Sequence, residues 1–282
     1  MRVLVTNDDG IESRGLGVLA RLAVEAGLDV VVAAPHTERS GASASLTALA
    51  EDGRLAVGER RWADLPDVPV RAVEASPALI GFVAAHGAFG PAPDLVLSGI
   101  NHGPNTGHAI LHSGTVGAAL TGATHGALAL AVSVAAADPR HWDTAEQVTR
   151  RALRWVIESG QRGSVLNINI PDVPPHELRG IRPAPLAAFG AVQADIGEVG
   201  ARFVTVTFRE IRAGERDQTD AGLVAQGWAT ATALRAPVEV AEVDLQALAW
   251  TGPGHRLPGP HDPDQRDRAS SSNRSMSSRR HT

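Results

Sequence analysis

The sequence predicts an α/β fold built around a mostly parallel sheet. Two short apolar runs, residues 3–5 and 29–34, have the length and composition of buried strands. Between them, residues 14–26 carry apolar side chains at helical spacing and are followed by Gly27, a common helix terminator. A strand, a helix and a strand in this order form a right-handed βαβ unit, whose two strands are parallel. The alternation of apolar runs and helical patterns continues to about residue 170.

The remaining elements follow from the same signals. Ser76 and Pro77 mark a helix start, because serine caps the first turn and proline fits its first position. We expect helices over residues 77–85, 116–123, 143–158, 217–228 and 240–250. We expect extended segments or strands over residues 46–49, 54–57, 68–73, 93–98, 127–134, 164–170, 203–208 and 229–234.

The domain organisation follows from a change of texture at Pro171. One α/β domain accounts for residues 1–250, with a core over about 1–170 and oligomerisation extensions over 171–250, where subunits could exchange hairpins. Beyond it, Pro, Gly, Ser, Asp and Arg dominate. We expect residues 251–282 to be a disordered, solvated tail, because they have almost no apolar side chains to bury.

The composition excludes several functional classes. With 43% hydrophobic and 20% charged residues, the 282-residue chain can bury a substantial core. A net charge of −5 argues against binding to duplex nucleic acid or to anionic membranes. Cysteine is absent and the 26 basic residues are all arginine, which removes thiolate, disulfide and lysine chemistry. We find no signal-peptide pattern and no bilayer-length apolar stretch, and expect a cytoplasmic protein.

The first candidate for chemistry is the turn that follows the first strand. Asn7, Asp8, Asp9 and Gly10 follow Val3–Val5 and Thr6, and strand ends are where open α/β sheets bind ligands. Two adjacent carboxylates repel each other unless a cation or a shared proton offsets their charge. Oxygen ligands of this kind suit Mg²⁺ or Mn²⁺. The alternative is that this tetrapeptide is only a turn.

The second candidate is the loop after the second strand, residues 35–45. Ser40 offers a neutral oxygen, and Gly41 allows backbone N–H groups to approach an anion. The alternative is a flexible surface loop. Gly15 and Gly17, in the preceding helix, do not complete a dinucleotide-binding fingerprint.

The third candidate is the stretch from residue 98 to residue 120. Its first ten positions hold three glycines and two asparagines, which predicts neither a core segment nor a regular element. Ser113, Gly114 and Thr115 then precede a helical run, where free N–H groups and the helix dipole favour an anion. The alternative is that Ser113 or Thr115 only caps this helix.

Together these candidates place Asp8, Asp9, Ser40 and Asn101 at the ends of consecutive strands. Carboxylates and neutral oxygens grouped in this way form a ligand set for one Mg²⁺ or Mn²⁺ ion, with room for water and a substrate phosphate. No Ser-His-Asp order or phosphoaspartate motif competes with this interpretation.

The chain resembles the stationary-phase survival protein SurE family. The resemblance covers residues 1 to about 250 and rests on five motifs. They are VTNDDGI at 5–11, AP at 34–35 with RSGAS at 39–43, SLT at 45–47, SGINHGPNTG at 98–107 and SGTV at 113–116. It implies a Rossmann-like three-layer α/β/α fold with C-terminal elements exchanged in homodimers or homotetramers. It also implies a metal-dependent phosphatase acting on nucleoside monophosphates, 5′ or 3′.

Carried over by position, the resemblance assigns each candidate a role. The metal ligands are Asp8, Asp9, Ser40 and Asn101, and the catalytic residues are Asp8 and Asp9. Substrate and phosphate contacts are expected from Asn7, Gly41, Asn105, Ser113, Gly114 and Thr115. Either aspartate could accept the proton of the attacking water, in a metal-assisted hydrolysis.

Three positions depart from the family pattern: His108 and His112, which replace an acid and often an aromatic, and Leu79, which stands where the family has an acid after Ser76-Pro77. These departures leave the substrate open, and a specialised phosphorylated metabolite is one alternative. Zinc binding by His102, His108 and His112 is another, although the surrounding glycines argue against it. A histidine at the pocket mouth could instead protonate the leaving alkoxide.

Two rival functions come from other classes. A binding protein could keep the metal and anion cleft without turnover. A different α/β enzyme could use a metal-bound diphosphate, as a nucleotide-sugar transferase or hydrolase does.

Overall fold

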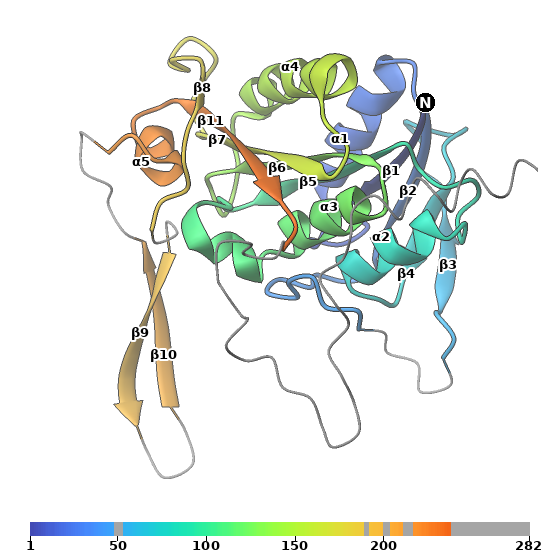
Figure 1. The fold of residues 1–282 in the computed structure, drawn as a ribbon, viewed down its shortest axis with the longest axis horizontal. Coiled ribbons are helices and arrows are strands. Elements are labelled where there is room, and N and C mark those ends of the chain that lie inside the picture. Colours follow the sequence, from blue (N-terminus) through green and yellow to red (C-terminus); the bar gives the residue numbers. More distant parts are fainter. Residues whose placement is uncertain (48–52, 189–191, 200–203, 211–216, 238–282) are drawn as a thin grey trace, which may run out of the picture. The chain divides into compact units, whose positions relative to one another are not determined.

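The centre of the fold is a mixed sheet, shown in Figure 1. The computed structural model describes residues 1–47, 53–188, 192–199, 204–210 and 217–237. In the main sheet the strands are β1 (Arg2–Thr6), β2 (Asp29–Pro35), β3 (Val57–Arg60), β4 (Val70–Val73), β5 (Leu95–His102), β6 (Leu128–Val134), β7 (Ser164–Ile170), β8 (Ile181–Pro183) and β11 (Ala229–Arg235). Among the described residues these nine strands lie in the order β3-β4-β2-β1-β5-β6-β7-β11-β8.

Most neighbouring strands in this sheet are parallel. The pairs from β4 through β2, β1, β5 and β6 to β7 all run in the same direction. Antiparallel pairs occur toward the two sides, where β3 pairs with β4 and β11 pairs with β7. A second, two-stranded antiparallel sheet consists of β9 (Val192–Val199) and β10 (Val204–Glu210).

Helices cover both faces of the main sheet. Figure 1 shows α1 (Arg14–Glu25) and α4 (Trp142–Ser159) on one face and α2 (Pro77–Ala85) and α3 (Gly114–Thr124) on the other. Within strand β1, Val3 and Val5 pack in the core under α1 and α4, whereas Leu4 packs in the core under α2. This alternation is the period-2 pattern of a strand buried on both faces. The predicted three-layer α/β/α class is therefore confirmed.

Local chemistry explains where the helices begin and end. Ser13 caps α1, accepting a hydrogen bond from the Leu16 N–H at 3.3 Å, and Ser76 caps α2 in the same way with Leu79. Gly15 allows α1 to approach β5, since a Cβ at this position would lie 2.0 Å from the Ile100 carbonyl oxygen. Gly15 therefore has a packing role, and the helix start does not carry the glycine pattern of a dinucleotide-binding site.

Three predicted elements have a boundary that is wrong by about three residues or more. The strand expected over 93–98 continues to His102, because a register shift after Ser98 lets the chain pair again with β6 at Asn101. The stretch 98–102 is thus part of strand β5, and Ile100 is fully buried. The helix expected over 217–228 is only α5 (Asp220–Ala225), which ends before Gly227 at φ +84°. The strand expected over 54–57 begins at Val57 instead.

Several predictions fall outside the described residues. They are the last helix at 240–250, the tail at 251–282 and part of the extended segment at 46–49, of which the described residues 46–47 are not in a strand. In the part of the chain that the structure describes, no helix is both long and apolar enough to cross a membrane.

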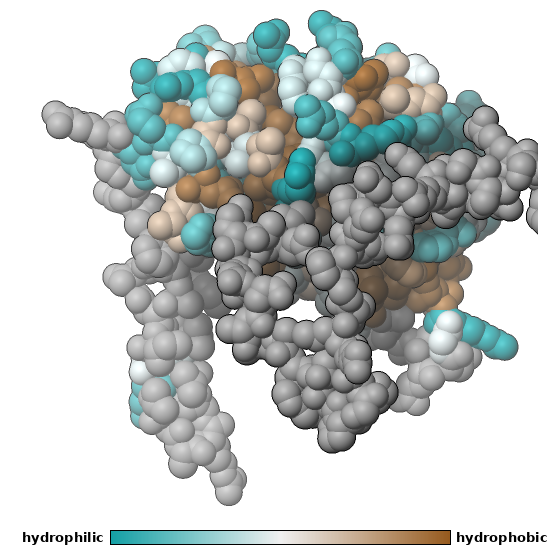
Figure 2. Space-filling model, viewed as in Figure 1, coloured by the Kyte–Doolittle hydropathy of each residue, from teal (hydrophilic) through white to brown (hydrophobic). Residues whose placement is uncertain are grey.

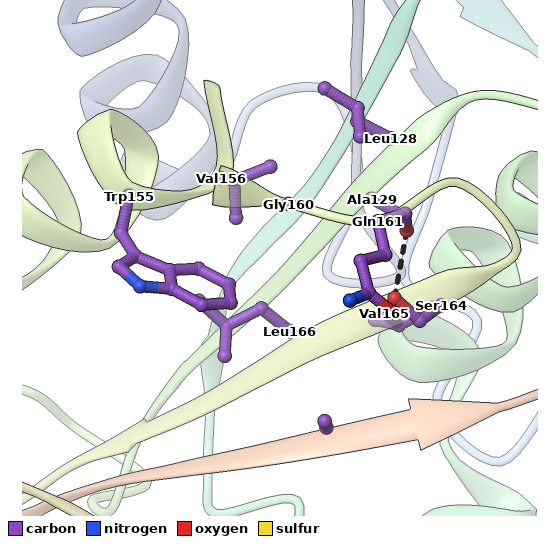
Figure 3. A pocket seen from close by; sticks show the side chains of 10 residues that line it. Leu128, Ala129, Trp155, Val156, Gly160, Gln161, Ser164, Val165 and Leu166 are labelled. Carbon is purple, nitrogen blue, oxygen red and sulfur yellow. Dashed lines mark hydrogen bonds between the residues drawn. The ribbon is translucent and has the colours of Figure 1, made fainter. Parts of the chain in front are cut away.

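A shallow hollow lies between α4 and the beginnings of β6 and β7, as Figure 3 shows. Leu128, Trp155 and Leu166 line it, and the Ser164 hydroxyl donates a hydrogen bond to the Gln161 carbonyl oxygen at 2.7 Å on one side. Trp155 is half exposed. Figure 2 shows hydrophobic and polar residues mixed on the face that it displays. The hollow lies at the amino ends of the parallel strands, away from the motifs that carry polar side chains.

Candidate active site at the carboxyl ends of strands β1 and β5

The predicted site residues gather where the strand order of the sheet reverses. Strand β1 pairs with β2 on one side and with β5 on the other, so the loops after β1 and β5 leave a crevice between them. Asp8 and Asp9 lie in the turn that follows β1, and Asn101 lies near the end of β5. This is the position at which open α/β sheets bind ligands.

The turn after β1 is fixed by the side chain of Asn7. Its amide oxygen accepts the Gly10 N–H at 3.2 Å, and its amide nitrogen donates to the Gly10 carbonyl at 3.1 Å and to the Ser13 hydroxyl at 2.6 Å. Gly10 completes the turn at φ +100°, a region that favours glycine. Asn7 is fully buried, so its side chain orients the two aspartates and does not face the crevice.

Asp8 is buried against the N-terminus of α3. The Thr115 hydroxyl donates a hydrogen bond to the Asp8 carboxylate, and the backbone N–H groups of Gly114 and Thr115 also stabilise its charge. A Cβ at position 114 would lie 2.7 Å from Asp8 Oδ2, so only glycine fits there. Burial nevertheless raises the pKa of Asp8, with these hydrogen bonds opposing the rise.

Asp9 is the more accessible carboxylate. Its Oδ2 accepts the backbone N–H of His102 at 3.3 Å. Burial, followed by the adjacent charge of Asp8, raises the pKa of Asp9 to about 7, and Glu38 adds to this repulsion. Among the ion pairs of the described residues, none offsets this charge: nearby Arg39 directs its guanidinium to Glu74, at 3.7 Å.

Asn101 presents its oxygen to the same place. Its amide nitrogen donates to the carbonyl oxygens of His102 and Gly103, at 3.2 and 2.8 Å, so the amide oxygen points the other way. That oxygen lies 3.2 Å from the Thr115 hydroxyl, which also contacts Asp8. The side chains of Asp8, Asn101 and Thr115 therefore converge on one point beside Asp9.

The loop that carries Ser40 lies against this group. The Arg39 N–H donates to the Asp8 carbonyl oxygen at 2.7 Å, which ties the loop to the aspartate turn. Ser40 is exposed, and its hydroxyl donates to Glu38 at 2.5 Å; among the hydrogen bonds of the described residues, none joins it to Asp8, Asp9 or Asn101. Gly41 is exposed at φ +78° in the same loop.

The Ser113–Thr115 turn has two structural roles. Ser113 caps α3 by accepting the Val116 N–H at 3.0 Å, which was the simpler interpretation of this motif. Gly114 and Thr115 turn their N–H groups toward the Asp8 carboxylate. The positive end of α3 thus already faces an anion, which is Asp8 itself. Contact between this turn and a substrate phosphate stays a prediction.

Asn105 is held by two residues that the sequence reasoning missed. Asn169 accepts the Asn105 backbone N–H at 2.7 Å and donates to its carbonyl oxygen at 2.9 Å, and Asn167 donates to the same oxygen at 2.9 Å. The Asn105 amide donates to Ser133 at 2.8 Å. Asn167 and Asn169 are fully buried on β7. Two asparagines two residues apart in an apolar strand were the available signal, since they share one face of the sheet.

The three histidines do not form a metal site. His108 and His112 are exposed on the 3₁₀ helix η1 (Gly107–His112), whereas His102 is partly buried with its ring edge-on to Trp142 at 5.9 Å. In the described part of the chain, no group of three His, Cys, Asp or Glu side chains could hold a metal ion. The zinc alternative therefore has no support in this arrangement.

Comparison with known proteins places this site in context. The family model for "Survival protein SurE" matches residues 3–191. The chain is 32% identical to the 5′/3′-nucleotidase SurE of Edwardsiella ictaluri over 256 residues, which cover 89% of this chain and 96% of that protein. It is 39% identical to the 5′-nucleotidase SurE of Methylococcus capsulatus over 189 residues, 67% of this chain and 71% of that protein.

A solved structure agrees with these matches. The crystal structure of the SurE protein from Aquifex aeolicus superposes with a TM-score of 0.69 and 28% identity, covering 83% of this chain and 93% of that one. The strand order, the aspartate turn after β1 and the extent of these matches lead to one conclusion: the chain belongs to the SurE survival-protein family.

Proposed function

We propose that this protein is a metal-dependent phosphomonoester hydrolase that releases phosphate from nucleoside 5′-monophosphates, with 3′-monophosphates as further substrates. The observation that carries the proposal is the pair Asp8 and Asp9, held beside Asn101 with no basic side chain paired to it among the described residues. The relatives named 5′-nucleotidase and 5′/3′-nucleotidase support the reaction class.

The donor set fits a hard divalent cation, Mg²⁺ or Mn²⁺. Asp8 and Asp9 supply carboxylate oxygens and Asn101 an amide oxygen, and the loop tied to Asp8 supplies the Ser40 hydroxyl. Burial and then the adjacent charge of Asp8 raise the pKa of Asp9, and among the described residues no ion pair offsets this charge. A cation held here would act as a Lewis acid on the phosphoryl group and on a water molecule.

The two aspartates have different surroundings and therefore different roles. Asp8 is buried, with its carboxylate engaged by Thr115 and the first N–H groups of α3, so it is held as a ligand. Asp9 is only partly buried and accepts a backbone N–H from His102. We assign to Asp9 the acceptance of the proton from the attacking water, because it is the carboxylate that solvent can reach.

Asn105 and the Ser113–Thr115 turn are proposed to orient the phosphate. The backbone of Asn105 is fixed by Asn167 and Asn169, and among the described residues its amide donates one hydrogen bond, to Ser133. The second hydrogen is available to a phosphoryl oxygen. Fixed donors of this kind stabilise charge on the equatorial oxygens without reorganising during the reaction.

The assembly belongs to the same proposal. Residues 171–250, which include the β9–β10 hairpin, are proposed to form contacts between copies in a homodimer or homotetramer. The cytoplasmic location and the domain limits at residues 250 and 251 stay predictions.

A substrate panel tests the function directly. Purified protein is assayed for phosphate release from 5′- and 3′-nucleoside monophosphates, other phosphomonoesters and sugar nucleotides, each with Mg²⁺, with Mn²⁺ and with EDTA. We expect turnover of monophosphates that EDTA abolishes. Cleavage of sugar nucleotides alone would indicate a different α/β enzyme, and tight nucleotide binding without phosphate release would indicate a non-catalytic relative.

A further inference from the structure

A buried carboxylate outside the aspartate pair contacts the loop that carries Asn105. Asp220 is fully buried at the start of α5. Its Oδ2 accepts the backbone N–H of Gly107 at 2.8 Å, and its Oδ1 accepts the N–H groups of Ala187 and Ala221, at 2.9 and 2.8 Å. Among the described residues, backbone N–H groups are the hydrogen-bond donors that hold this charge.

These bonds join two distant parts of the chain. Asp220 is 113 residues from Gly107 and lies beyond the residues 3–191 that match the family model. Gly107 follows the Asn105 loop directly and begins η1. The other end of this loop is held by the Gly103 N–H, which donates to the Val134 carbonyl oxygen at 2.9 Å.

The loop from 103 to 107 is thus fixed at three points. Val134 holds its beginning, Asn169 holds its middle at Asn105, and Asp220 holds its end at Gly107. A charged acceptor makes a hydrogen bond roughly twice as strong as a neutral one. Removing it leaves buried N–H groups without partners.

We propose that Asp220 is a positioning residue, which sets the place of the Asn105 loop and thereby the affinity for phosphate. The inference rests on the proposed function, because it assigns Asn105 to the substrate phosphate. It also gives the C-terminal part of the chain a role at the site, because the Asp220 carboxylate at the start of α5 holds the end of the Asn105 loop at Gly107.

Asp220→Asn separates this role from a general loss of stability. Its amide has one acceptor oxygen, and two N–H groups, those of Ala187 and Ala221, already share one side of the carboxylate. With the oxygen kept on that side, the amide nitrogen faces the Gly107 N–H, donor against donor. The substitution therefore releases Gly107 selectively.

Thr219→Ala is the matched control. The Thr219 hydroxyl caps the same helix by accepting the Gly222 N–H at 3.3 Å, so its loss weakens α5 but leaves the Asp220 carboxylate in place. Both variants should melt at a lower temperature than the wild type, and only Asp220→Asn should affect the loop.

The experiment measures steady-state kinetics, inhibition by inorganic phosphate, Mn²⁺ affinity and hydrogen exchange of residues 101–112. For Asp220→Asn we expect KM and the inhibition constant of phosphate to rise about tenfold, with kcat within about threefold and Mn²⁺ affinity unchanged. Exchange across 101–112 should become faster. Thr219→Ala should change none of these. Unchanged KM and exchange in folded Asp220→Asn, or equal changes in both variants, would overturn the proposal.

Two safeguards keep the test decisive. If Asp220→Asn does not fold, Asp220→Ser is measured in its place. If neither variant folds, hydrogen exchange of the wild type decides. Exchange of the Gly107 amide that is fast relative to that of Ala187 overturns the proposal, and slow exchange supports it. If the wild type releases no phosphate, the proposed function fails, while hydrogen exchange and phosphate binding still test the positioning role.

Discussion

Carboxylates lie near both ends of strand β1, and the surroundings of the two groups differ: Asp29 and Asp94 lie beside its amino end, and Asp8 and Asp9 follow its carboxyl end. At the amino ends, Arg2 pairs with Asp29 at 2.9 Å and its backbone N–H donates to Asp94 at 2.9 Å. At the carboxyl ends, Asp8 and Asp9 stand side by side, and no ion pair of the described residues includes either of them. One end of the strand pair is balanced in charge and the other is not.

The difference indicates which end has been shaped for function. The Asp29 side chain is 64% exposed and would be well solvated even without Arg2. Asp8 is 5% exposed, and the hydrogen bonds from Thr115 and the start of α3 only partly offset the cost of burying its negative charge. A buried charge imbalance of this kind is expected where a ligand supplies the missing charge. The following predictions test this contrast, starting with the largest expected effect.

Asp9→Asn should abolish turnover. The substitution keeps the size of the side chain but removes the proton acceptor and one negative ligand, so we expect phosphate release to fall roughly a thousandfold or more. Asp94→Asn, at the opposite end of the same strands, is the control and should retain wild-type activity. Comparable activity in both variants would show that the two ends do not differ in function.

Gly114→Ala should damage the site through packing. The added Cβ would lie 2.7 Å from Asp8 Oδ2, which forces Asp8 away from Thr115. We expect a loss of about 1–3 kcal/mol in the free energy of unfolding, together with at least about tenfold lower activity. Denaturation and initial rates measure the two effects.

Gly17→Ala is its control, because Gly17 lies within α1 and a Cβ there meets nothing within 4 Å. It should stabilise the protein by about 0.5–1 kcal/mol and leave activity unchanged. Equal behaviour of the two alanine variants would contradict the packing assigned to Asp8.

The metal-free protein should lose stability as the pH rises through the titration of Asp9. The folded-state pKa of about 7 lies above the ordinary aspartate value of 3.8, so the folded state binds this proton more tightly than the unfolded state does. The stabilisation of the folded state by this proton is therefore complete below about pH 4 and is lost as the pH rises through about 7. Urea unfolding in EDTA measures it across this range.

Two comparisons sharpen the pH experiment. Asp9→Asn should show a smaller decline between about pH 4 and pH 7, because the titrating group is gone. Added Mn²⁺ should stabilise the wild type more at about pH 8 than at about pH 5, since the ion competes with the proton. A wild-type curve that is the same as that of Asp9→Asn would count against the raised pKa.

Asp29→Asn should have the smallest effect. It breaks the exposed pair with Arg2, which is worth at most about 1 kcal/mol, and it lies at the amino ends of the strands. We expect unchanged kinetics and a shift in unfolding free energy below about 1 kcal/mol. A marked loss of activity would mean that charge at the two ends is coupled.

Local patterns in the sequence were sufficient for much of the fold. The strand predicted over 164–170 and the helix predicted over 77–85 have those limits in the structure, because apolar periodicity and the Ser76-Pro77 start are local signals. The strand-end position of Asp8 and Asp9 follows in the same way, from a short apolar run that stops at a polar turn.

Non-local contacts account for what the sequence did not reveal. The glycines at 99 and 103 predicted an irregular segment, yet pairing with β6 extends β5 to His102. The role of Asn169 depends on the backbone of Asn105, 64 residues away, and the role of Asp220 depends on Gly107. Periodicity and composition carry no information about such pairs.

The most direct test of the central claim is anomalous diffraction from crystals soaked in Mn²⁺. The account predicts one anomalous peak among the oxygens of Asp8, Asp9 and Asn101, with the Ser40 hydroxyl near it. A map without density at that place, or a manganese ion bound elsewhere with Ser40 and Asn101 remote from it, would contradict the account.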